Sequence, residues 1–420
     1  MRSVQAKKVS IVNNETLIVT VDIGKTKNFG YCRCPKGKDI KPFGFHNNGH
    51  GLKYFWDKIT QMRKAHNLKV VVVGFEPTGP YGEPLVHYLR KKKVKLIQVN
   101  PMHTKRVKEL QGNSPNKTDQ KDPKVIADII ELGHALTIVL PEGTAAELRR
   151  LTHSRERAMQ RRTSFFNQLQ NLLFVIFPEF SQVMKNVKTK SSMYILEHCP
   201  TPEDIIKYTL KNLTVTLRKV SRGQIKEERA RELYTAAETS VGIKEGRKSI
   251  LFEIKEILSM IKATENYIAE IEKEEMSHHL KDIPYSKFII SMKGIGEITV
   301  AGLIGEVGDF REYNTISEIL KLGGLDLFEV SSGIHKGQRR ISKRGRPLMR
   351  KLLFFAAINV VRKGGIMREY YQGCLDRGML KMKALIAVSR KLLGLIFVLV
   401  RDQSEYIEDY VEKQKLKKAA

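Results

Sequence analysis

The sequence predicts an N-terminal α/β domain with a mixed sheet, then a long helical arm and a mainly α-helical C-terminal domain. Three observations predict this order. Short apolar runs alternate with helical patterns over the first 140 residues, two long helical patterns follow, and apolar helices surround a glycine turn in the last third. We predict domain boundaries at residues 1–140, 141–284 and 285–420.

The N-terminal domain is predicted from its succession of elements. Five segments have strand character, residues 16–23, 28–34, 40–45, 69–75 and 94–99. Two segments have helical character, residues 52–65 and 83–92. Three strands, a helix and then strand–helix–strand are typical of an α/β domain in which parallel and antiparallel strands share one sheet.

The arm is predicted from two long helical patterns. Thr144 and Glu147 have the spacing of a capping box, which predicts a helix over residues 145–177 that stops at Pro178. A second helix is predicted over residues 246–276, where apolar residues alternate by four and three in a heptad seam. Such a seam indicates a helix partner, here a coiled coil, and says nothing of function.

The first arm helix begins with a run of cations. We predict that they hold nucleic-acid phosphates: Arg149, Arg150, Arg155, Arg157, Arg161 and Arg162.

The C-terminal domain opens with a glycine turn, Met292-Lys-Gly-Ile-Gly296, followed by an apolar helix. Helix-hairpin-helix modules use such a turn to bring backbone N–H groups close to a phosphate. Gly294 and Gly296 are therefore candidate nucleic-acid contacts, although a plain tight turn fits the sequence equally well.

Composition favours a nucleic-acid partner. Lys and Arg number 74 against 45 Asp and Glu, which gives a net charge of +29. A compact body with so much charge favours a polyanion as its partner. Four cysteines are too few for a disulfide framework, and the N-terminus lacks the apolar core of a signal peptide. The apolar run at residues 392–400 is too short to span a bilayer. We expect a cytoplasmic protein with no membrane partner.

Four acidic residues carry the candidate chemistry. Asp22 lies at the end of the first predicted strand, Glu76 lies just past the predicted buried strand 69–75, and Asp119 and Asp122 lie three apart at a predicted helix start. Four carboxylates at one sheet edge would select Mg²⁺ or Mn²⁺. Each acid alone also fits a structural role: a helix cap for Asp122, a turn acid for Glu76, or a partner of Lys25 for Asp22.

A basic stretch without acidic residues runs from 330 to 368 and contains two adjacent serines, Ser331 and Ser332. A serine in a phosphate-attracting loop can act as a nucleophile if its proton is removed or offset. From the residues alone, phosphate binding or turn capping by these serines is the simpler interpretation. Five cations nearby are further candidate nucleic-acid contacts: Lys336, Arg339, Arg340, Lys343 and Arg344.

Taken together in their order, five motifs closely resemble one family. They are VDIGK, GFEPTG, NKTDQKD, KGIGEITVAGLIGEVGDF, and GGLDLFEVSSG followed by ISKRG. This set resembles the IS110 family of bacterial insertion-sequence transposases, which includes bridge-RNA-guided recombinases. The resemblance extends over nearly the whole chain.

The resemblance implies an N-terminal RuvC-like domain of RNase-H-like fold, whose tetrad Asp22, Glu76, Asp119 and Asp122 binds Mg²⁺. It implies a C-terminal transposase domain with a serine nucleophile that forms a phosphoserine intermediate on DNA. The family serine falls on Ser332, one position after Ser331.

The same resemblance implies partners: donor and target DNA, a structured guide RNA that pairs with both, and further copies of the chain in a dimer or tetramer. Metal and serine domains of different copies would then meet at one site, in a protein associated with the bacterial nucleoid.

Two other functions stay open. A RuvC-like nuclease that resolves branched DNA would use the same acids but no serine. A nucleic-acid-binding scaffold would use neither, and the retained acids and serine argue against it. A sugar-kinase-like ATPase would need a second phosphate-binding repeat, which we do not find in the sequence.

Overall fold

The computed structural model describes residues 12–35, 39–77, 79–111, 122–137, 139–329, 331–332, 335–337 and 339–408. The chain divides into two compact units, residues 1–139 and residues 140–420.

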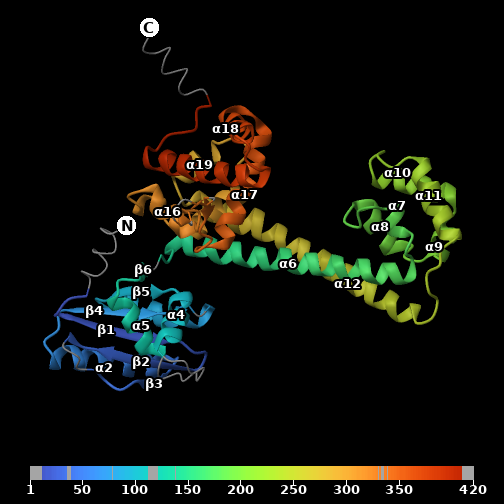
Figure 1. Ribbon diagram of the computed structural model, residues 1–420. Coiled ribbons are helices and arrows are strands. Elements are labelled where there is room, and N and C mark those ends of the chain that lie inside the picture. Colours follow the sequence, from blue (N-terminus) through green and yellow to red (C-terminus); the bar gives the residue numbers. More distant parts are fainter. Residues whose placement is uncertain are drawn as a thin grey trace, which may run out of the picture. The chain divides into compact units, whose positions relative to one another are not determined.

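The first unit is built on a six-stranded sheet with the order β3-β2-β1-β4-β5-β6 (Figure 1). The strands are β1 (Thr16–Asp22), β2 (Lys27–Arg33), β3 (Phe43–His46), β4 (Val70–Phe75), β5 (Lys95–Val99) and β6 (Ala135–Thr137). Strand β4 is parallel to β1 and β5, and the other pairs are antiparallel. The predicted mixed sheet is confirmed. The sequence analysis missed β6, because three residues are too few to show a strand pattern.

Helices cover both faces of this sheet. They are α2 (Gly49–Ala65), α3 (Glu83–Arg90), α4 (Pro101–Gln111) and α5 (Asp122–Glu131), with a 3-10 turn at Gly79–Gly82. Tyr31 of β2 belongs to the apolar core under α5, whereas a Cβ on the neighbouring Gly30 would contact Phe55 of α2. Since successive strand residues point to opposite faces, α5 and α2 lie on opposite sides of the sheet.

The second unit contains the two predicted long helices, α6 (Gly143–Ile176) and α12 (Arg247–Glu270), side by side in Figure 1. Helix α12 continues through a π-helical turn, Ile271–Met276. Arg155 pairs with Glu272 and Arg162 with Glu265, so the two helices are antiparallel. Most of the predicted seam is buried, including Ile254, Ile257, Ile261 and Ile268.

The predicted capping box at Thr144 is wrong. Helix α6 begins two residues before the predicted start, at Gly143, and its N-cap is Glu142, which makes no side-chain cap hydrogen bond. Gly143 adopts a φ of +50°, a conformation that glycine tolerates, and the Glu142 carbonyl accepts a hydrogen bond from the Ala146 N–H. Thr144 therefore lies inside the helix.

Short helices join the far ends of α6 and α12 and share one apolar core with them. They are α7 (Phe180–Val183), α8 (Lys190–His198), α9 (Pro202–Tyr208), α10 (Leu210–Val220) and α11 (Glu227–Glu238). Helix α9 has a capping box of its own, in which Thr201 and Asp204 satisfy each other's backbone N–H groups.

The near end of the arm packs against the C-terminal helices around a second apolar core. These are α13 (Ser277–Lys281), α14 (Ser286–Ile290), α15 (Glu297–Val307), a 3-10 turn (Phe310–Glu312), α16 (Ile316–Gly323), α17 (Pro347–Lys363), α18 (Gly365–Asp376) and α19 (Lys381–Arg401). The apolar run at residues 392–400 lies in α19, where most of its side chains are buried. None of the described helices has the length and apolar composition needed to cross a membrane.

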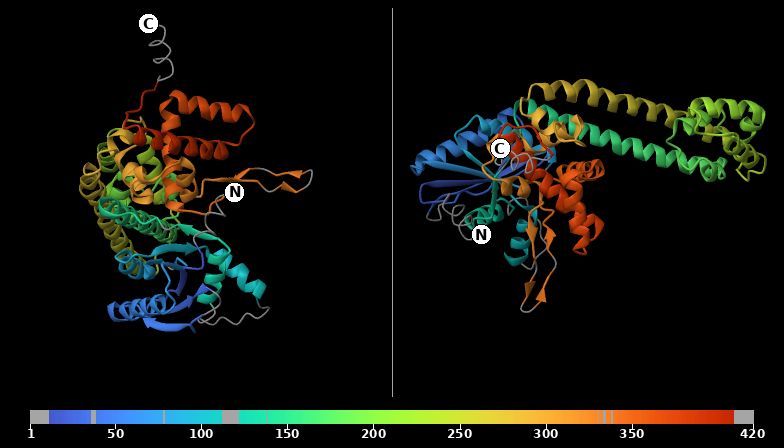
Figure 2. Two further views of the ribbon diagram at one scale, coloured as in Figure 1. Left: turned by 90° about the vertical axis from the view of Figure 1, so that its left-hand side faces the viewer. Right: turned by 90° about the horizontal axis from the view of Figure 1, so that it is seen from above.

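A β-hairpin separates α16 from α17 and extends away from the helices of this unit (Figure 2, orange). Its base pairs β7 (Leu327–Phe328) with β10 (Arg340–Ile341), and its outer part pairs β8 (Ser331–Ser332) with β9 (His335–Lys336).

Candidate functional site

The parallel pairing of β1 and β4 places Asp22 and Glu76 at corresponding positions. In this register Thr20 faces Gly74 and Val21 faces Phe75, so the next pair is Asp22 and Glu76. Neighbouring strands lie about 4.8 Å apart. Both acidic residues are half-buried, at the carboxyl ends of adjacent strands.

Asp22 lies on the sheet face that α5 covers. Ile18 and Val72 belong to the core cluster under α5, and a Cβ on Gly74 would lie 2.4 Å from a methyl carbon of Ile130 in α5. Side chains alternate along a strand, so Asp22, at even spacing from Ile18 in β1, falls on that face, whereas Glu76 directly follows the last residue of β4.

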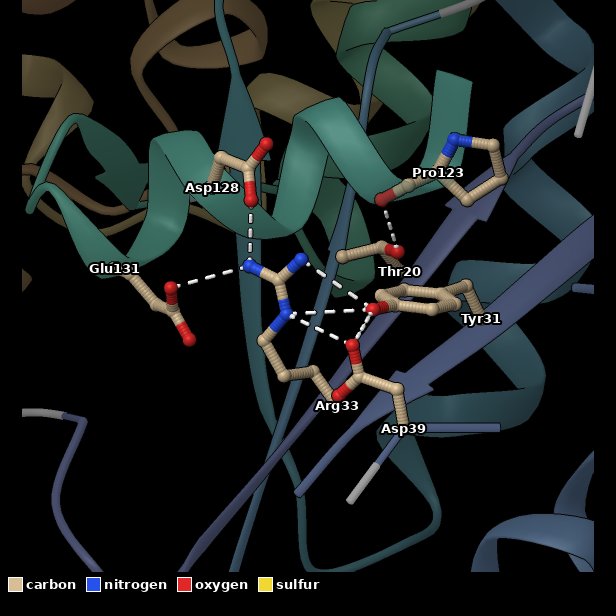
Figure 3. Close-up of polar contacts among 7 residues, drawn as sticks. All are labelled: Thr20, Tyr31, Arg33, Asp39, Pro123, Asp128 and Glu131. Atoms are coloured by element: carbon tan, nitrogen blue, oxygen red, sulfur yellow. Dashed lines mark hydrogen bonds and ion pairs between the residues drawn. The ribbon is translucent and has the colours of Figure 1, made fainter. Parts of the chain in front are cut away.

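The first turn of α5 brings a third acid to this edge. The Thr20 hydroxyl donates a 2.6 Å hydrogen bond to the carbonyl of Pro123, which follows Asp122 (Figure 3). Asp122 is the first residue of α5, and its side chain is 14% exposed. Its carboxylate forms a 2.6 Å ion pair with the ammonium of Lys108 in α4. A lysine therefore supplies the positive charge beside this acid.

The fourth predicted acid, Asp119, lies outside the described residues. Within the described part of the chain, no group of three or more His, Cys, Asp or Glu side chains is arranged to hold a metal ion. The structure thus brings Asp22, Glu76 and Asp122 to one edge of one domain without forming a complete set of metal ligands.

A polar cluster that the sequence analysis missed holds the other end of α5. Arg33 of β2 donates to Asp128 at 2.6 Å and to Glu131 at 3.1 Å, both on α5 (Figure 3). It also pairs with Asp39, which accepts a short hydrogen bond from Tyr31. Arg33 is separated from Asp128 by 95 positions and from Glu131 by 98, so these contacts leave no local signal in the sequence.

Protonation within this cluster follows from burial and pairing. Burial alone would lower the pKa of Arg33, but its hydrogen bonds to Asp128 and Tyr31 outweigh that effect and raise the pKa. Burial, together with the hydrogen bond to Asp39, raises the pKa of Tyr31 to about 12. At neutral pH the guanidinium is charged and the phenol is protonated.

Three of the six arginines predicted to bind phosphate on α6 form ion pairs within the second unit. Arg149 pairs with Glu306 at 2.8 Å, and Arg155 and Arg162 pair with acids of the antiparallel helix. Arg150 also has a partner. Arg157 and Arg161 are exposed and, being four residues apart, lie on one side of the helix.

Glu306 is a buried acid that the sequence analysis missed. Its side chain is 1% exposed and accepts from Arg149 and His153 of α6, each at 2.8 Å. Arg346, at the start of α17, donates to the Glu306 backbone carbonyl. Burial lowers the pKa of Arg346 to about 10, with a contribution from the nearby charge of Arg149. The sequence did contain a signal for this buried acid, because Glu306 is the one charged residue in the apolar run VAGLIGEV.

The glycine turn lies beside cations contributed by α17. Gly294 has a φ of +100°, and a Cβ there would lie 3.1–3.2 Å from the backbone of Asn359 and Val360. An open hollow is lined by Gly294, Ile295, Gly296, Asn359, Arg362 and Lys363. Both predicted glycines line it, and the structure adds two basic residues that the predicted contacts did not include.

The serine-bearing hairpin is held at its base. Ser342 donates to Asp326 at 2.6 Å, and Arg339 pairs with Glu329 at 2.9 Å. In the outer part, Ser331 lies opposite Lys336 in the strand register and Ser332 opposite His335. Among the other predicted contacts, Arg340, Lys343 and Arg344 are exposed.

All four cysteines are buried and free. Burial raises the pKa of the Cys32 thiol to about 12, which keeps it protonated. The free cysteines agree with the expectation that the chain has no disulfide framework.

Two family models match the chain in order. A model described as a transposase matches residues 19–178, which include Asp22, Glu76 and Asp122. A model of the IS116/IS110/IS902 transposase family matches residues 286–372, from the glycine turn through the serine hairpin.

Curated relatives agree with these models. An insertion element IS110 protein of 43.6 kDa from Streptomyces coelicolor is 23% identical over 92% of this chain and 94% of its own length. An insertion element IS116 protein of Streptomyces clavuligerus is 26% identical over 68% of this chain and 72% of its own. An insertion element IS900 protein of Mycobacterium paratuberculosis is 22% identical over 69% of this chain and 73% of its own length.

The transposase models together cover more than half of the sequence, and the first of these relatives aligns with almost all of it. The chain therefore belongs to the IS110 family of insertion-sequence DNA transposases.

Proposed function

We propose that this transposase cuts and rejoins DNA with two sets of residues: a metal-binding set of Asp22, Glu76, Asp119 and Asp122, and a nucleophile, Ser332. The observation that supports this proposal is that Asp22 ends β1, Glu76 directly follows the adjacent parallel strand β4, and Asp122 begins α5, which Thr20 of β1 joins through Pro123. We assign the first unit an RNase-H-like, RuvC-type role because a mixed sheet presents these acids at its strand ends.

The acids would hold Mg²⁺ or Mn²⁺, since hard oxygen ligands select these ions. Bound divalent ions stabilise the attacking and leaving oxygens of a phosphodiester displacement. The carboxylates of Asp22 and Glu76, on adjacent strands, provide a rigid pair of ligands, whereas Asp122 arrives on the first turn of a helix. Lys108 would release Asp122 when an ion binds.

In the cutting step, the Ser332 oxygen would bond to a DNA phosphorus while the bond from that phosphorus to one DNA oxygen breaks, and the serine hydroxyl proton would pass, directly or through water, to the leaving oxygen, which becomes a DNA hydroxyl. Joining reverses the exchange, with a DNA hydroxyl displacing the serine from the phosphoserine. Each step exchanges one phosphorus–oxygen bond for another, so no external energy source is needed. The hairpin extends away from the helices of its unit (Figure 2), which supports a role in contacting DNA.

The basic surfaces would hold the nucleic acids. Arg157 and Arg161 on α6, and Lys343 and Arg344 beside the hairpin, are exposed cations suited to phosphate. We propose that one partner is a structured guide RNA, which would select DNA by base pairing while the protein reads the backbone. A dimer or tetramer would let the metal domain of one copy serve the serine hairpin of another.

Trapping of covalent protein–DNA complexes tests this assignment. In the presence of Mg²⁺ and DNA carrying the element ends, we expect Ser332→Ala to abolish the covalent complex. Ser331→Ala, the matched control, should retain it. The alanine variants of Asp22, Glu76 and Asp122 should lose strand exchange while retaining nucleic-acid binding. An alanine variant that recombines at the normal rate would remove that acid from the set.

A RuvC-like nuclease is the second candidate, because the acids alone would support hydrolysis. It predicts cleaved DNA without any covalent complex, and cleavage that Ser332→Ala leaves unchanged. The same trapping experiment therefore separates the two functions.

A further inference from the structure

Helix α5, which begins with Asp122, is attached to the sheet by polar contacts at both ends (Figure 3). Near its start, the hydroxyl of Thr20 donates to the Pro123 carbonyl at 2.6 Å. Near its end, Arg33 donates to Asp128 and Glu131. The apolar core between these contacts contains Ile18 and Val72 from the sheet and five apolar residues of the helix, Val125, Ile126, Ala127, Ile129 and Ile130.

The Thr20 contact has a property that apolar packing lacks. Burial of apolar surface is non-directional, whereas a hydrogen bond favours a narrow range of length and angle. Thr20 is completely buried, so water does not replace its bond. The contact therefore fixes how far the first turn of α5 lies along β1.

The position of Thr20 links two of the acids directly. Thr20 precedes Asp22 by two residues in β1, on the same face, and Pro123 directly follows Asp122. The hydrogen bond thus joins β1 to α5 close to both acids. Its donor, Thr20, is two residues from Asp22, and its acceptor, Pro123, is one residue from Asp122. A small shift of α5 along the strand would change the separation of those carboxylates.

Arg33 acts at the other end of the helix. Its guanidinium contacts two acids one turn apart on α5 and is itself held by Tyr31 and Asp39. A planar group bonded to both Asp128 and Glu131 restricts rotation of the helix about its axis. The two contacts restrict different motions, translation at the start and rotation at the end.

We infer that Thr20 and Arg33 are positioning residues that set the distance of Asp122 from Asp22 and so the affinity of this edge for Mg²⁺ or Mn²⁺. Neither residue contacts the ion or the DNA in this role. The inference rests on the proposed function, because it requires that these acids bind metal. Residues that orient metal ligands typically contribute 10- to 100-fold to metal affinity.

The test replaces Thr20 in the full-length protein and measures Mn²⁺ binding directly, by calorimetry and by the electron paramagnetic resonance signal of free Mn²⁺. Thr20→Val removes the hydroxyl and keeps the branched shape, and Thr20→Ser keeps the hydroxyl as the matched control. We expect Thr20→Val to bind Mn²⁺ about tenfold more weakly, and Thr20→Ser to bind as the unmodified protein does. Raised Mn²⁺ should restore DNA cleavage by Thr20→Val.

Suppose that folded Thr20→Val binds Mn²⁺ as tightly as the unmodified protein, while Asp122→Ala binds Mn²⁺ much more weakly. This result would overturn the inference about Thr20 and leave the metal proposal intact. Mn²⁺ binding that survives in both Asp22→Ala and Asp122→Ala would instead overturn the metal proposal, and this inference with it. If Thr20→Val does not fold, Arg33→Lys decides by the same measurement. Weaker binding would support the inference, and unchanged binding would refute it.

Discussion

At the scale of single residues, the ion pair of Lys108 with Asp122 has a measurable consequence. A divalent ion that binds Asp122 must displace the lysine ammonium, which lies 2.6 Å from the carboxylate. We predict that Lys108→Met tightens Mn²⁺ binding in the absence of DNA. An exposed ion pair contributes up to about 1 kcal/mol, or roughly fivefold in affinity. Calorimetric titration measures this, with Lys105→Met as a control on the same helix, and unchanged affinity would contradict it.

Glu306 is a second residue whose effect can be measured. The buried carboxylate of Glu306 balances the positive charges of Arg149 and Arg346. The substitution Glu306→Gln removes that negative charge and leaves both arginines unbalanced. We predict a loss of about 3 kcal/mol in the free energy of unfolding, as expected when one partner of a buried pair is removed. Urea denaturation followed by circular dichroism measures the loss. The exposed ion pair of Arg231 with Glu227 provides the control, because Glu227→Gln should cost far less.

The same acid predicts a dependence on pH. Burial alone would raise the pKa of Glu306, but the His153 hydrogen bond and the charges of Arg149 and Arg346 lower it below 4.5. A lowered folded-state pKa stabilises the fold fully above the unfolded value, and this stabilisation is lost as pH falls through the folded-state value. The stability difference between the unmodified protein and Glu306→Gln should therefore be constant from pH 7 to about 5 and shrink below pH 4.5. A difference that persists at pH 3 would argue against this origin.

At the scale of elements, the α6 arginines divide into two groups. Arg155 and Arg162 pair with acids of the neighbouring helix, whereas Arg157 and Arg161 are exposed. We predict that Arg157→Gln with Arg161→Gln reduces the salt dependence of nucleic-acid binding by about two phosphate contacts. Fluorescence anisotropy measures the binding constant at salt concentrations between about 50 and 200 mM. The slope of its logarithm against the logarithm of the salt concentration gives the number of phosphate contacts.

The matched double variant, Arg155→Gln with Arg162→Gln, should instead lower thermal stability and leave the salt slope nearly unchanged, because these side chains already have partners. If both double variants changed the salt dependence of nucleic-acid binding equally, the division of the α6 arginines into paired and exposed groups would be contradicted.

The hairpin is a second element that can be tested on its own. Replacing residues 329–339 by Asn-Gly would connect Phe328 of β7 to Arg340 of β10, the partner it already pairs with, through a tight turn. We predict an unchanged melting temperature, because the described side chains at the two ends of the removed segment, Glu329 and Arg339, are exposed. Covalent attachment to DNA should be lost. A melting temperature lowered by more than about 5 °C would show that the hairpin supports the fold.

At the scale of the whole molecule, charge and architecture have separate roles. The net charge of +29 favours a polyanionic partner at long range, irrespective of which cations contact it. The structure then removes several cations from that role by pairing them with acids, as with Arg149 and Arg33. A count of basic residues therefore overstates the surface available to nucleic acid.

The sequence by itself determined the parts that depend on neighbours along the chain. Strand and helix patterns follow from periodicity, so the mixed sheet and the two long helices were predictable. Asp22 and Glu76 could be identified because the first ends a buried strand and the second directly follows one. The prediction failed where local signals compete, as at Thr144, where a glycine with positive φ starts the helix two residues before its predicted start.

Only the tertiary structure decided which distant residues meet. The bond of Thr20 to Pro123 spans 103 positions, and the pair of Arg149 with Glu306 spans 157. Such contacts depend on how helices pack on the sheet and on each other, and packing follows from shape and burial over the whole domain rather than from periodicity. For that reason the sequence could name Asp122 as a candidate, but only the packed fold showed that the buried Thr20 of β1 bonds to Pro123, the residue that follows Asp122 in α5.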